Sequence, residues 1–142
     1  IPIFVDPKGK KWNKYYGASI ITPNLKEAED ALGKLLKNDG DVEQAGMEIC
    51  NDLSLDACLI TRGPNGMSYI GKDAKFHVSS EAKEIYDVSG AGDTVIASFA
   101  TGTLAGFDSE TVTRFANKAA GIVVGHIGTT AITISELKED SN

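Results

Sequence analysis

Short apolar runs alternate along the chain with segments in which apolar residues recur every three or four positions. The runs IPIFV (1–5) and ASIIT (18–22) predict buried strands, because continuous apolar stretches of this length are typical of sheet interiors. Segment 22–33 then predicts a helix, with Thr22 as its cap and Pro23 in its first turn. The next apolar positions predict a second helix, because they share helical spacing. They are Val42, Ala45, Ile49, Cys50 and Leu53.

The middle of the chain predicts strands and tight turns. Residues 57–70, ACLITRGPNGMSYI, have the pattern of strand, turn and strand. FHVSS (76–80) and EIYDV (84–88) predict two further short strands, with the turn GKDAK before the first. FHVSS and EIYDV predict a hairpin-like edge of a sheet.

The last third of the chain predicts helices. One apolar stripe ends before Gly106 and a second follows a cap at Asp108 or Ser109. The stripes are Val95, Ile96, Phe99, Ala100 and Leu104, then Val112, Phe115, Ala116, Ala119, Ala120, Val123 and Val124. A strand-like run, AITI (131–134), and a capped turn, SELKED (135–140), come last. Strand-helix alternation favours an α/β fold with a mainly parallel sheet and helices on both faces, whose ligands bind at the carboxyl ends of strands.

Composition and charge exclude several classes of protein. The 142 residues are 42% hydrophobic and 24% charged, which predicts one folded domain over 1–142 rather than a disordered or fibrous chain. No apolar run reaches the roughly 20 residues of a membrane span, and no leader opens the sequence, so we expect a soluble, cytoplasmic protein without a membrane partner. A net charge of -6 disfavours nucleic acid as a partner. Cys50 and Cys58 are expected as reduced core residues. His77 and His126 lack a second ligand at metal spacing.

The stretch DVSGAGDT (87–94) carries the first candidate chemistry. Gly90 and Gly92 allow main-chain amides to approach an anion at the start of a helix. Asp93 would stand beside that anion, where it can take a proton from a substrate hydroxyl during phosphoryl transfer. A plain glycine-rich turn with a helix-start acid explains the stretch equally well. A dinucleotide-binding fingerprint is disfavoured because Val95 stands in place of its third glycine. A P-loop is excluded because no Gly-Lys followed by Ser or Thr closes the glycine run.

Other loops carry weaker signals of phosphate binding. TRGPNG offers the Thr61 hydroxyl, the Arg62 guanidinium and the amides near Gly63 and Gly66, although a plain hairpin turn is favoured on this motif alone. The loop DPKG, with Asp6 and Lys8 at a strand end, would supply one cationic side chain to the reacting phosphates. A solvated loop explains it equally well.

The segment NLKE has the spacing of a capping box. Asn24 and Glu27 are therefore expected to be structural when taken alone. The functional alternative is that the carboxylate positions a magnesium ion.

Taken together, these loops resemble the ribokinase-like (PfkB) carbohydrate kinases. The resemblance rests on PNLKE, TRGPNG, DVSGAGD and ANKAAGIVVGHIGT, which occur in the family's order over nearly the whole chain. More narrowly, DPKG, TPNLKEAE, TRGPNGMS, YDVSGAGDTVI and FANKAAGIVVGHIGT are similar to the D-glycero-D-manno-heptose 7-phosphate kinase domain of ADP-heptose synthesis for lipopolysaccharide. The resemblance implies an enzyme that transfers phosphate from ATP, with Mg²⁺, to a hydroxyl of a sugar or sugar phosphate.

The resemblance also implies roles for individual residues. Asp93 becomes the catalytic base, with an anion hole formed by Gly90, Ala91 and Gly92. Asn24, Glu27 and Lys8 become positions associated with phosphate and magnesium. The residues implied in ATP binding are Thr61, Arg62, Gly63 and Gly66 at the phosphates and Asn117 and Gly121 beside the adenine.

A monovalent cation such as K⁺ is implied near Asp87 and Ser89. The sequence departs from the family here, because Val88 and Ser89 stand where Thr and a variable residue are common.

Family members are about twice this long. The resemblance therefore implies that the chain is the ATP-binding, catalytic C-terminal half of the domain. The missing N-terminal half would carry most sugar contacts, and its absence predicts self-association and an inactive isolated chain. Two alternatives remain open: a nucleotide-binding or assembly module without turnover, and a kinase of another sugar.

Overall fold

The computed structural model describes residues 1–82, 90–125 and 132–139. Contacts divide the chain into two compact units, Ile1–Val78 and Ser79–Asn142, and each is described by itself. The single domain over 1–142 stays a prediction. The expected strand EIYDV (84–88) lies outside the described residues.

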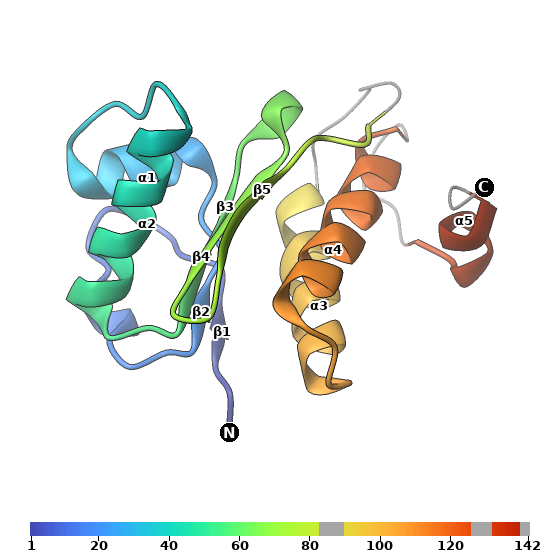
Figure 1. Cartoon of the computed structure of the whole chain (residues 1–142), viewed down its shortest axis with the longest axis horizontal. Helices are drawn as coiled ribbons and strands as arrows, with labels where there is room; N and C mark the ends of the chain where they lie inside the picture. The colour runs from blue at the N-terminus through green and yellow to red at the C-terminus, as the bar shows by residue number, and fades with distance from the viewer. Residues whose placement is uncertain (83–89, 126–131, 140–142) are drawn as a thin grey trace. The chain divides into compact units, whose positions relative to one another are not determined.

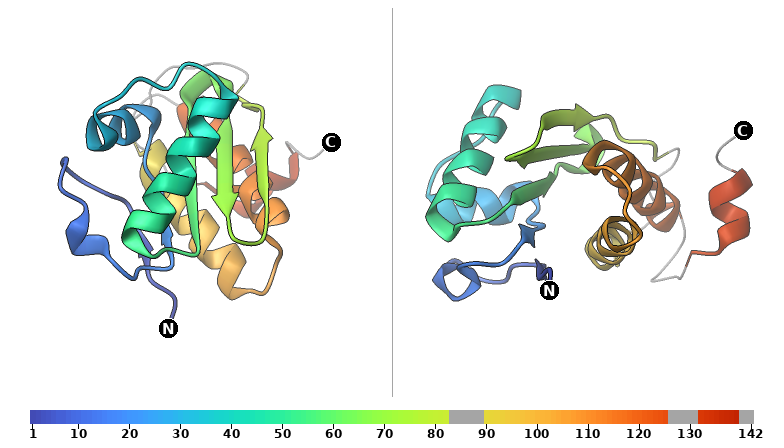
Figure 2. Two further views of the ribbon diagram at one scale, coloured as in Figure 1. Left: turned by 60° about the vertical axis from the view of Figure 1, so that its left-hand side comes forward. Right: turned by 60° about the horizontal axis from the view of Figure 1, so that its bottom comes forward.

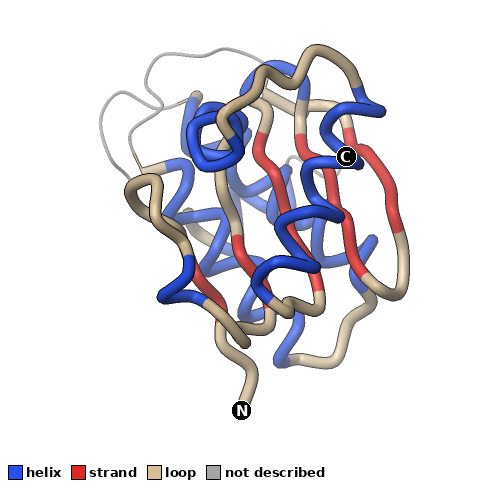
Figure 3. Tube along the Cα trace, turned by 90° about the vertical axis from the view of Figure 1, so that its left-hand side faces the viewer, coloured by secondary structure: helices blue, strands red, loops and turns tan. Residues whose placement is uncertain are grey.

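The first unit contains a five-stranded sheet in the order β1-β2-β3-β4-β5 (Figures 1 and 3). Its strands are β1 (Phe4–Val5), β2 (Ile20–Ile21), β3 (Ala57–Thr61), β4 (Met67–Gly71) and β5 (Lys75–Val78). β1, β2 and β3 pair in parallel, and β4 and β5 continue the sheet as antiparallel strands. The predicted α/β class is confirmed, in a sheet that is mixed. Of the predicted hairpin-like edge, FHVSS (76–80) contributes to the antiparallel strand β5, and its partner EIYDV lies outside the described residues.

The first two strands are shorter than their apolar runs. β1 and β2 pair only through Phe4 with Ile20 and Val5 with Ile21. One residue earlier, the Ile3 amide donates to the Ser19 Oγ at 2.9 Å, so a side chain takes the place of a ladder partner.

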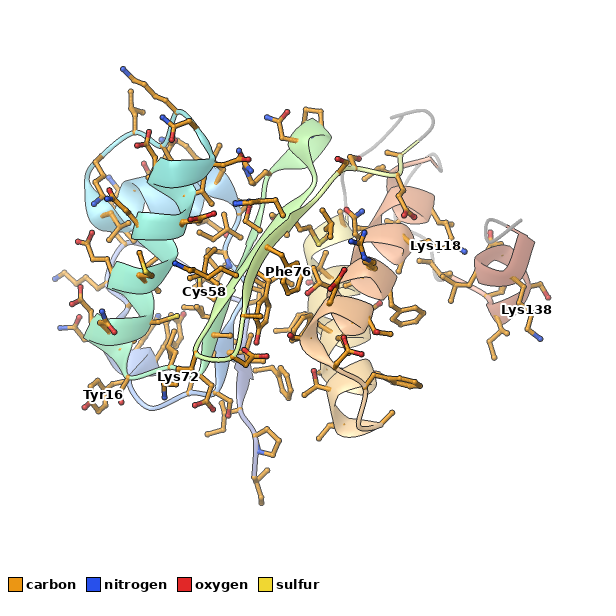
Figure 4. All side chains as sticks on the ribbon, viewed as in Figure 1. Tyr16, Cys58, Lys72, Phe76, Lys118 and Lys138 are labelled. Carbon is orange, nitrogen blue, oxygen red and sulfur yellow. The ribbon has the colours of Figure 1, made fainter. Side chains whose placement is uncertain are left out.

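Helices α1 (Leu25–Leu32) and α2 (Asp39–Leu53) cover one face of this sheet (Figure 2). The α2 positions predicted to face the core are confirmed: four are buried and Cys50 is partly buried. Cys58 of β3 lies in the same core (Figure 4). The buried core consists of Trp12, Ala18, Ile21, Ala28, Leu36, Val42, Ala45, Ile49, Leu53, Leu55, Cys58, Ile60 and Ile70.

Two local features set how these helices begin and pack. The cap of α1 is Asn24 and not Thr22, because the Thr22 hydroxyl donates to the Val5 carbonyl at 3.4 Å and Pro23 precedes the helix. A Cβ added to Gly46 of α2 would lie 2.7 Å from the Ile70 Cβ, so glycine permits the close approach of α2 to β4.

The second unit contains α3 (Ala91–Leu104), α4 (Ser109–Val124) and α5 (Ile134–Glu139). α3 and α4 lie side by side (Figure 1), and a Cβ on Gly102 would lie 3.0 Å from the Val112 Cγ2. Asp108, one of the two predicted caps, begins α4. The predicted strand AITI is wrong in its described part, because Ile134 already belongs to α5, whose first turn is capped by Thr133 and Glu136.

Two residues of the predicted apolar stripes are exposed. Leu104 is 67% exposed in the last turn of α3. Phe115 of α4 is 38% exposed. It precedes the buried Ala116 by one residue, so its side chain points about 100° away from that of Ala116 around the helix. The stripes are therefore narrower than the sequence pattern predicted.

Candidate functional site

Three polar loops follow the parallel strands, so they share the edge of the sheet at which these strands end. Asp6 and Lys8 follow β1, Asn24 follows β2 with Glu27 in the first turn of α1, and Thr61 ends β3 with Arg62 directly after it. Asn24 and Thr61 form a parallel β-bridge, and the Thr61 amide donates to the Pro23 carbonyl at 3.0 Å. The structure thus brings together six of the residues singled out from the sequence.

Two carboxylates converge on one ammonium group in these loops. The Lys8 Nζ lies 3.0 Å from the Asp6 Oδ2 and 3.6 Å from the Glu27 Oε1. The hydrogen bond that the Lys8 ammonium group donates to Asp6, with the charges of Asp6 and Glu27, raises the pKa of Lys8 above its ordinary value despite some desolvation. Because the carboxylates outnumber the ammonium group, the cluster has a formal negative charge that suits a cation or a metal-bound phosphate better than a bare anion.

The capping box at the start of α1 is present in full. The Glu27 amide donates to the Asn24 Oδ1 at 2.8 Å, and the Asn24 amide donates to the Glu27 Oε2 at 2.8 Å. The structural interpretation of NLKE is therefore confirmed. The capping box uses only one oxygen of the Glu27 carboxylate, because the other oxygen, Oε1, faces Lys8.

The segment TRGPNG forms the turn between β3 and β4, which confirms the hairpin. A short 3-10 helix, Gly63–Asn65, occupies its centre, and Gly63 and Gly66 have positive φ angles of 55° and 84°. The Arg62 side chain turns to the start of α2, where its Nη1 donates to the Asp39 Oδ1 at 2.7 Å.

The second unit presents a helix start of the kind expected for anion binding. Gly90 precedes α3 in a left-handed conformation with φ 78°, and no side chain of the described residues caps the helix. The helices α1, α2 and α4 begin instead at the side-chain caps Asn24, Asn38 and Asp108. Ala91 and Gly92 open α3, and the exposed Asp93 lies in its first turn. Uncapped amides and the positive end of the helix dipole at this point favour a bound anion.

Asn117 and Gly121 of α4 face segment 79–82, which precedes the stretch DVSGAGDT (87–94). The Asn117 side chain is 5% exposed, and its Nδ2 donates to the Ser79 carbonyl at 2.7 Å. A Cβ on Gly121 would lie 3.2 Å from the Ala82 amide nitrogen. Main chain therefore occupies the space beside Gly121, and the contact of both residues with adenine stays a prediction.

Asp87 and Ser89, implied in binding a monovalent cation, lie outside the described residues. Within the described part of the chain, no three His, Cys, Asp or Glu side chains are grouped so that they could hold a metal ion. No helix of that part has the length and apolar character needed to cross a membrane.

Sequence reasoning missed a polar network that links the hairpin to α2. Its members are Asp39, Arg62, Ser68, His77 and Glu43. His77 was considered only as a metal ligand. No local signal predicts its contact with Glu43, because 34 positions separate the two residues in the sequence.

Comparison with known proteins gives the family of this α/β chain. Residues 1–136 match the family described as pfkB family carbohydrate kinase. The chain belongs to this family.

The curated relatives are considerably longer than the chain. It is 43% identical over 140 residues to the bifunctional protein HldE of Vibrio parahaemolyticus, and 46% identical over 140 residues to that of Pseudomonas putida strain GB-1. These matches cover 98% and 97% of the chain but 29% of each relative.

Solved structures show the same fold. Phosphofructokinase-2 from Escherichia coli, in complex with substrates and products, matches with a TM-score of 0.87 at 20% identity, over 97% of this chain and 46% of that one. Ribokinase from Arabidopsis thaliana, complexed with ribose and ATP, matches with a TM-score of 0.87 at 26% identity, over 100% of this chain and 48% of that one. The fold is ribokinase-like.

Proposed function

We propose that the protein containing this chain is an ATP-dependent kinase that phosphorylates a hydroxyl of heptose 7-phosphate in ADP-heptose synthesis for lipopolysaccharide, in the cytoplasm. The family supports a carbohydrate kinase. The narrower substrate is supported by the identity of 43–46% to HldE proteins and by the motifs that resemble heptose kinases. Because the chain spans 29% of those relatives, the missing sugar-binding half is part of the proposal.

The observation that carries the proposal is the uncapped start of α3, with a left-handed Gly90 before it and Asp93 in its first turn. The main-chain amides of Gly90, Ala91 and Gly92 steady the negative charge that builds up on the transferred phosphoryl group. The Asp93 carboxylate accepts the proton of the sugar hydroxyl as the hydroxyl oxygen attacks the γ-phosphorus. The bond from that phosphorus to the β,γ-bridging oxygen breaks, and ADP leaves.

The loops after β1, β2 and β3 would hold the rest of the nucleotide. Thr61 and the turn Arg62–Gly66 would line its phosphates. The sequence resemblance alone supports a place for Asn117 and Gly121 beside the adenine. Mg²⁺ would be held by the Asp6 and Glu27 carboxylates, because this ion commonly uses one or two carboxylates together with substrate phosphates and water, and the Lys8 ammonium group would instead meet phosphate oxygens. When bound, the magnesium ion neutralises charge on the phosphates. Asn24 would help place the Glu27 carboxylate through the capping box.

A monovalent cation near Asp87 and Ser89 is also proposed. Its support is the sequence resemblance, together with the E. coli phosphofructokinase-2 structure in complex with potassium. Self-association of the isolated chain stays a prediction.

Kinetics of Asp93→Asn in the full-length protein test the assignment. We expect turnover to fall by several orders of magnitude, because the base is lost, while calorimetry shows an almost unchanged affinity for ATP with Mg²⁺. Asp108→Asn is the matched control: it changes the same residue type at the start of α4, and asparagine also caps helices well. Full activity of Asp93→Asn would refute the role of Asp93. Binding of ATP by wild type without turnover on any sugar would favour the alternative, a nucleotide-binding module.

A further inference from the structure

The Arg62 guanidinium is engaged in a polar network at the base of the β3–β4 turn. Its Nη1 donates to the Asp39 Oδ1 at 2.7 Å and to the Ser68 Oγ at 3.2 Å. The Arg62 side chain is 10% exposed, and its Nε is buried with no hydrogen-bond partner among the described residues. The guanidinium is therefore turned into the protein and held through Nη1.

The network continues through the hairpin to a second point on α2. The fully buried Ser68 faces His77 across β4 and β5, with its Oγ 2.6 Å from the His77 Nδ1. The His77 Nε2 lies 2.8 Å from the Glu43 Oε1. Because arginine only donates, the Ser68 hydroxyl accepts from Arg62 and can donate to Nδ1, which leaves the Nε2 proton for Glu43. Every hydrogen bond of the series is satisfied in this arrangement.

The network joins α2 to the β3–β4 turn through Asp39 and to β5 through Glu43. Asp39 and Glu43 are four residues apart, so they lie on the same side of α2, one turn from each other. The hydrogen bond from Arg62, together with the Arg62 charge, holds the pKa of Asp39 below its ordinary value against some desolvation. The carboxylate thus remains charged over the range in which the protein would work.

The same arginine begins the turn that is proposed to meet the ATP phosphates. The Arg62 amide donates to the Gly66 carbonyl at 2.7 Å, and the Asn65 amide donates to the Arg62 carbonyl at 3.0 Å. The main chain of Arg62 therefore fixes the shape of the turn, and its side chain fixes the place of the turn relative to α2. Lys8, by contrast, is 69% exposed at the strand ends.

We propose that Arg62 is a positioning residue, whose side chain anchors the 61–66 turn to Asp39 and Ser68, and that the nucleotide phosphates meet Thr61 and the main chain of the turn rather than the guanidinium. This inference rests on the proposed kinase function. It assigns Asp39, which belongs to α2 and lies far from the kinase motifs in the sequence, an indirect part in ATP binding.

Steady-state kinetics of the full-length protein test the inference through Arg62→Met, Asp39→Asn and the double variant. Each single variant should raise the KM for ATP by about tenfold with a smaller change in kcat, because the turn is displaced while Asp93 is untouched. The double variant should have no larger effect than the stronger single variant, because both substitutions break the same interaction between Arg62 and Asp39. Arg62→Lys should recover part of the loss, because an ammonium group can still pair with Asp39.

One variant serves as the control, and different results refute the inference and the proposed function. Arg114→Met is the matched control, because Arg114 forms an exposed ion pair with Glu110 at 2.8 Å in the second unit, and its KM should equal that of wild type. The inference is overturned if Arg62→Met raises the KM strongly while Asp39→Asn leaves it unchanged, or if neither variant changes it. Absence of ATP-dependent turnover and of ATP binding in wild type would instead refute the proposed function, and the inference with it.

Discussion

Replacing Glu27 with glutamine separates the two roles of this side chain, the helix cap and the proposed magnesium position. Glutamine keeps an oxygen for the Asn24 amide, now 2.8 Å from the Glu27 Oε2, and is itself a usual capping-box residue. The lost charge is 3.6 Å from the Lys8 Nζ, and the Lys8 side chain is 69% exposed, so the ion pair contributes only about 0–1 kcal/mol to stability. Glu27→Gln should therefore unfold in urea almost as wild type does.

The activity of the same variant should change much more than its stability. If the carboxylate helps to hold Mg²⁺ on ATP, Glu27→Gln should need roughly tenfold more Mg²⁺ for half-maximal rate, because a neutral amide holds the ion and its water less well. Glu27→Ala should add a loss of about 1 kcal/mol in stability, since the Asn24 amide also loses its hydrogen-bond acceptor. Glu110→Gln is the control, because it also removes one carboxylate from an exposed ion pair. An unchanged Mg²⁺ dependence of Glu27→Gln would show that Glu27 only caps the helix.

Three further predictions concern packing, the anion hole and the thiols. Gly46→Ala should lower the free energy of unfolding by about 1–3 kcal/mol, because the new Cβ would lie 2.7 Å from Ile70 atoms, and an unchanged urea midpoint would contradict that packing. Gly92→Ala should keep stability, since no neighbouring atom of the described residues lies within 4 Å of the added Cβ, but should reduce turnover by blocking close approach of the phosphate; full kcat would argue against the anion hole. Burial raises the pKa of Cys50 to about 11 and that of Cys58 well above its ordinary value, so neither thiol should be alkylated quickly at neutral pH until urea unfolds the protein, and rapid labelling of the native protein would contradict this.

Hydrophobic spacing predicted the helices of the chain better than its strands. The apolar positions of α2 were predictable because the helical period itself reports which side is buried. The ends of β1 and β2 were not, because an apolar run does not reveal that Ser19 supplies a side-chain acceptor to the Ile3 amide. The exposure of Leu104 and Phe115 was likewise not predicted, because apolar spacing shows which side of a helix is buried but not how wide the buried stripe is.

The site was predictable where main-chain geometry defines it. Loops that follow parallel strands must share one edge of the sheet, so the proximity of Lys8 and Glu27 followed from the order of strands and loops. The positive φ of Gly90 and the absence of a cap followed from its glycine-rich sequence. The engagement of Arg62 by Asp39 did not, because long-range polar contacts depend on the packed positions of two elements. For the same reason a motif indicated that Arg62 matters but not what it contacts.

Transfer of an isotope-labelled γ-phosphate from ATP to heptose 7-phosphate by the full-length protein tests the central claim most directly. Mass spectrometry of the products should show one labelled phosphate gained by the sugar for each ADP formed, with no transfer above background by Asp93→Asn. The account would be contradicted if wild type forms no labelled product with this or any other sugar or sugar phosphate, or if Asp93→Asn transfers the label at the wild-type rate.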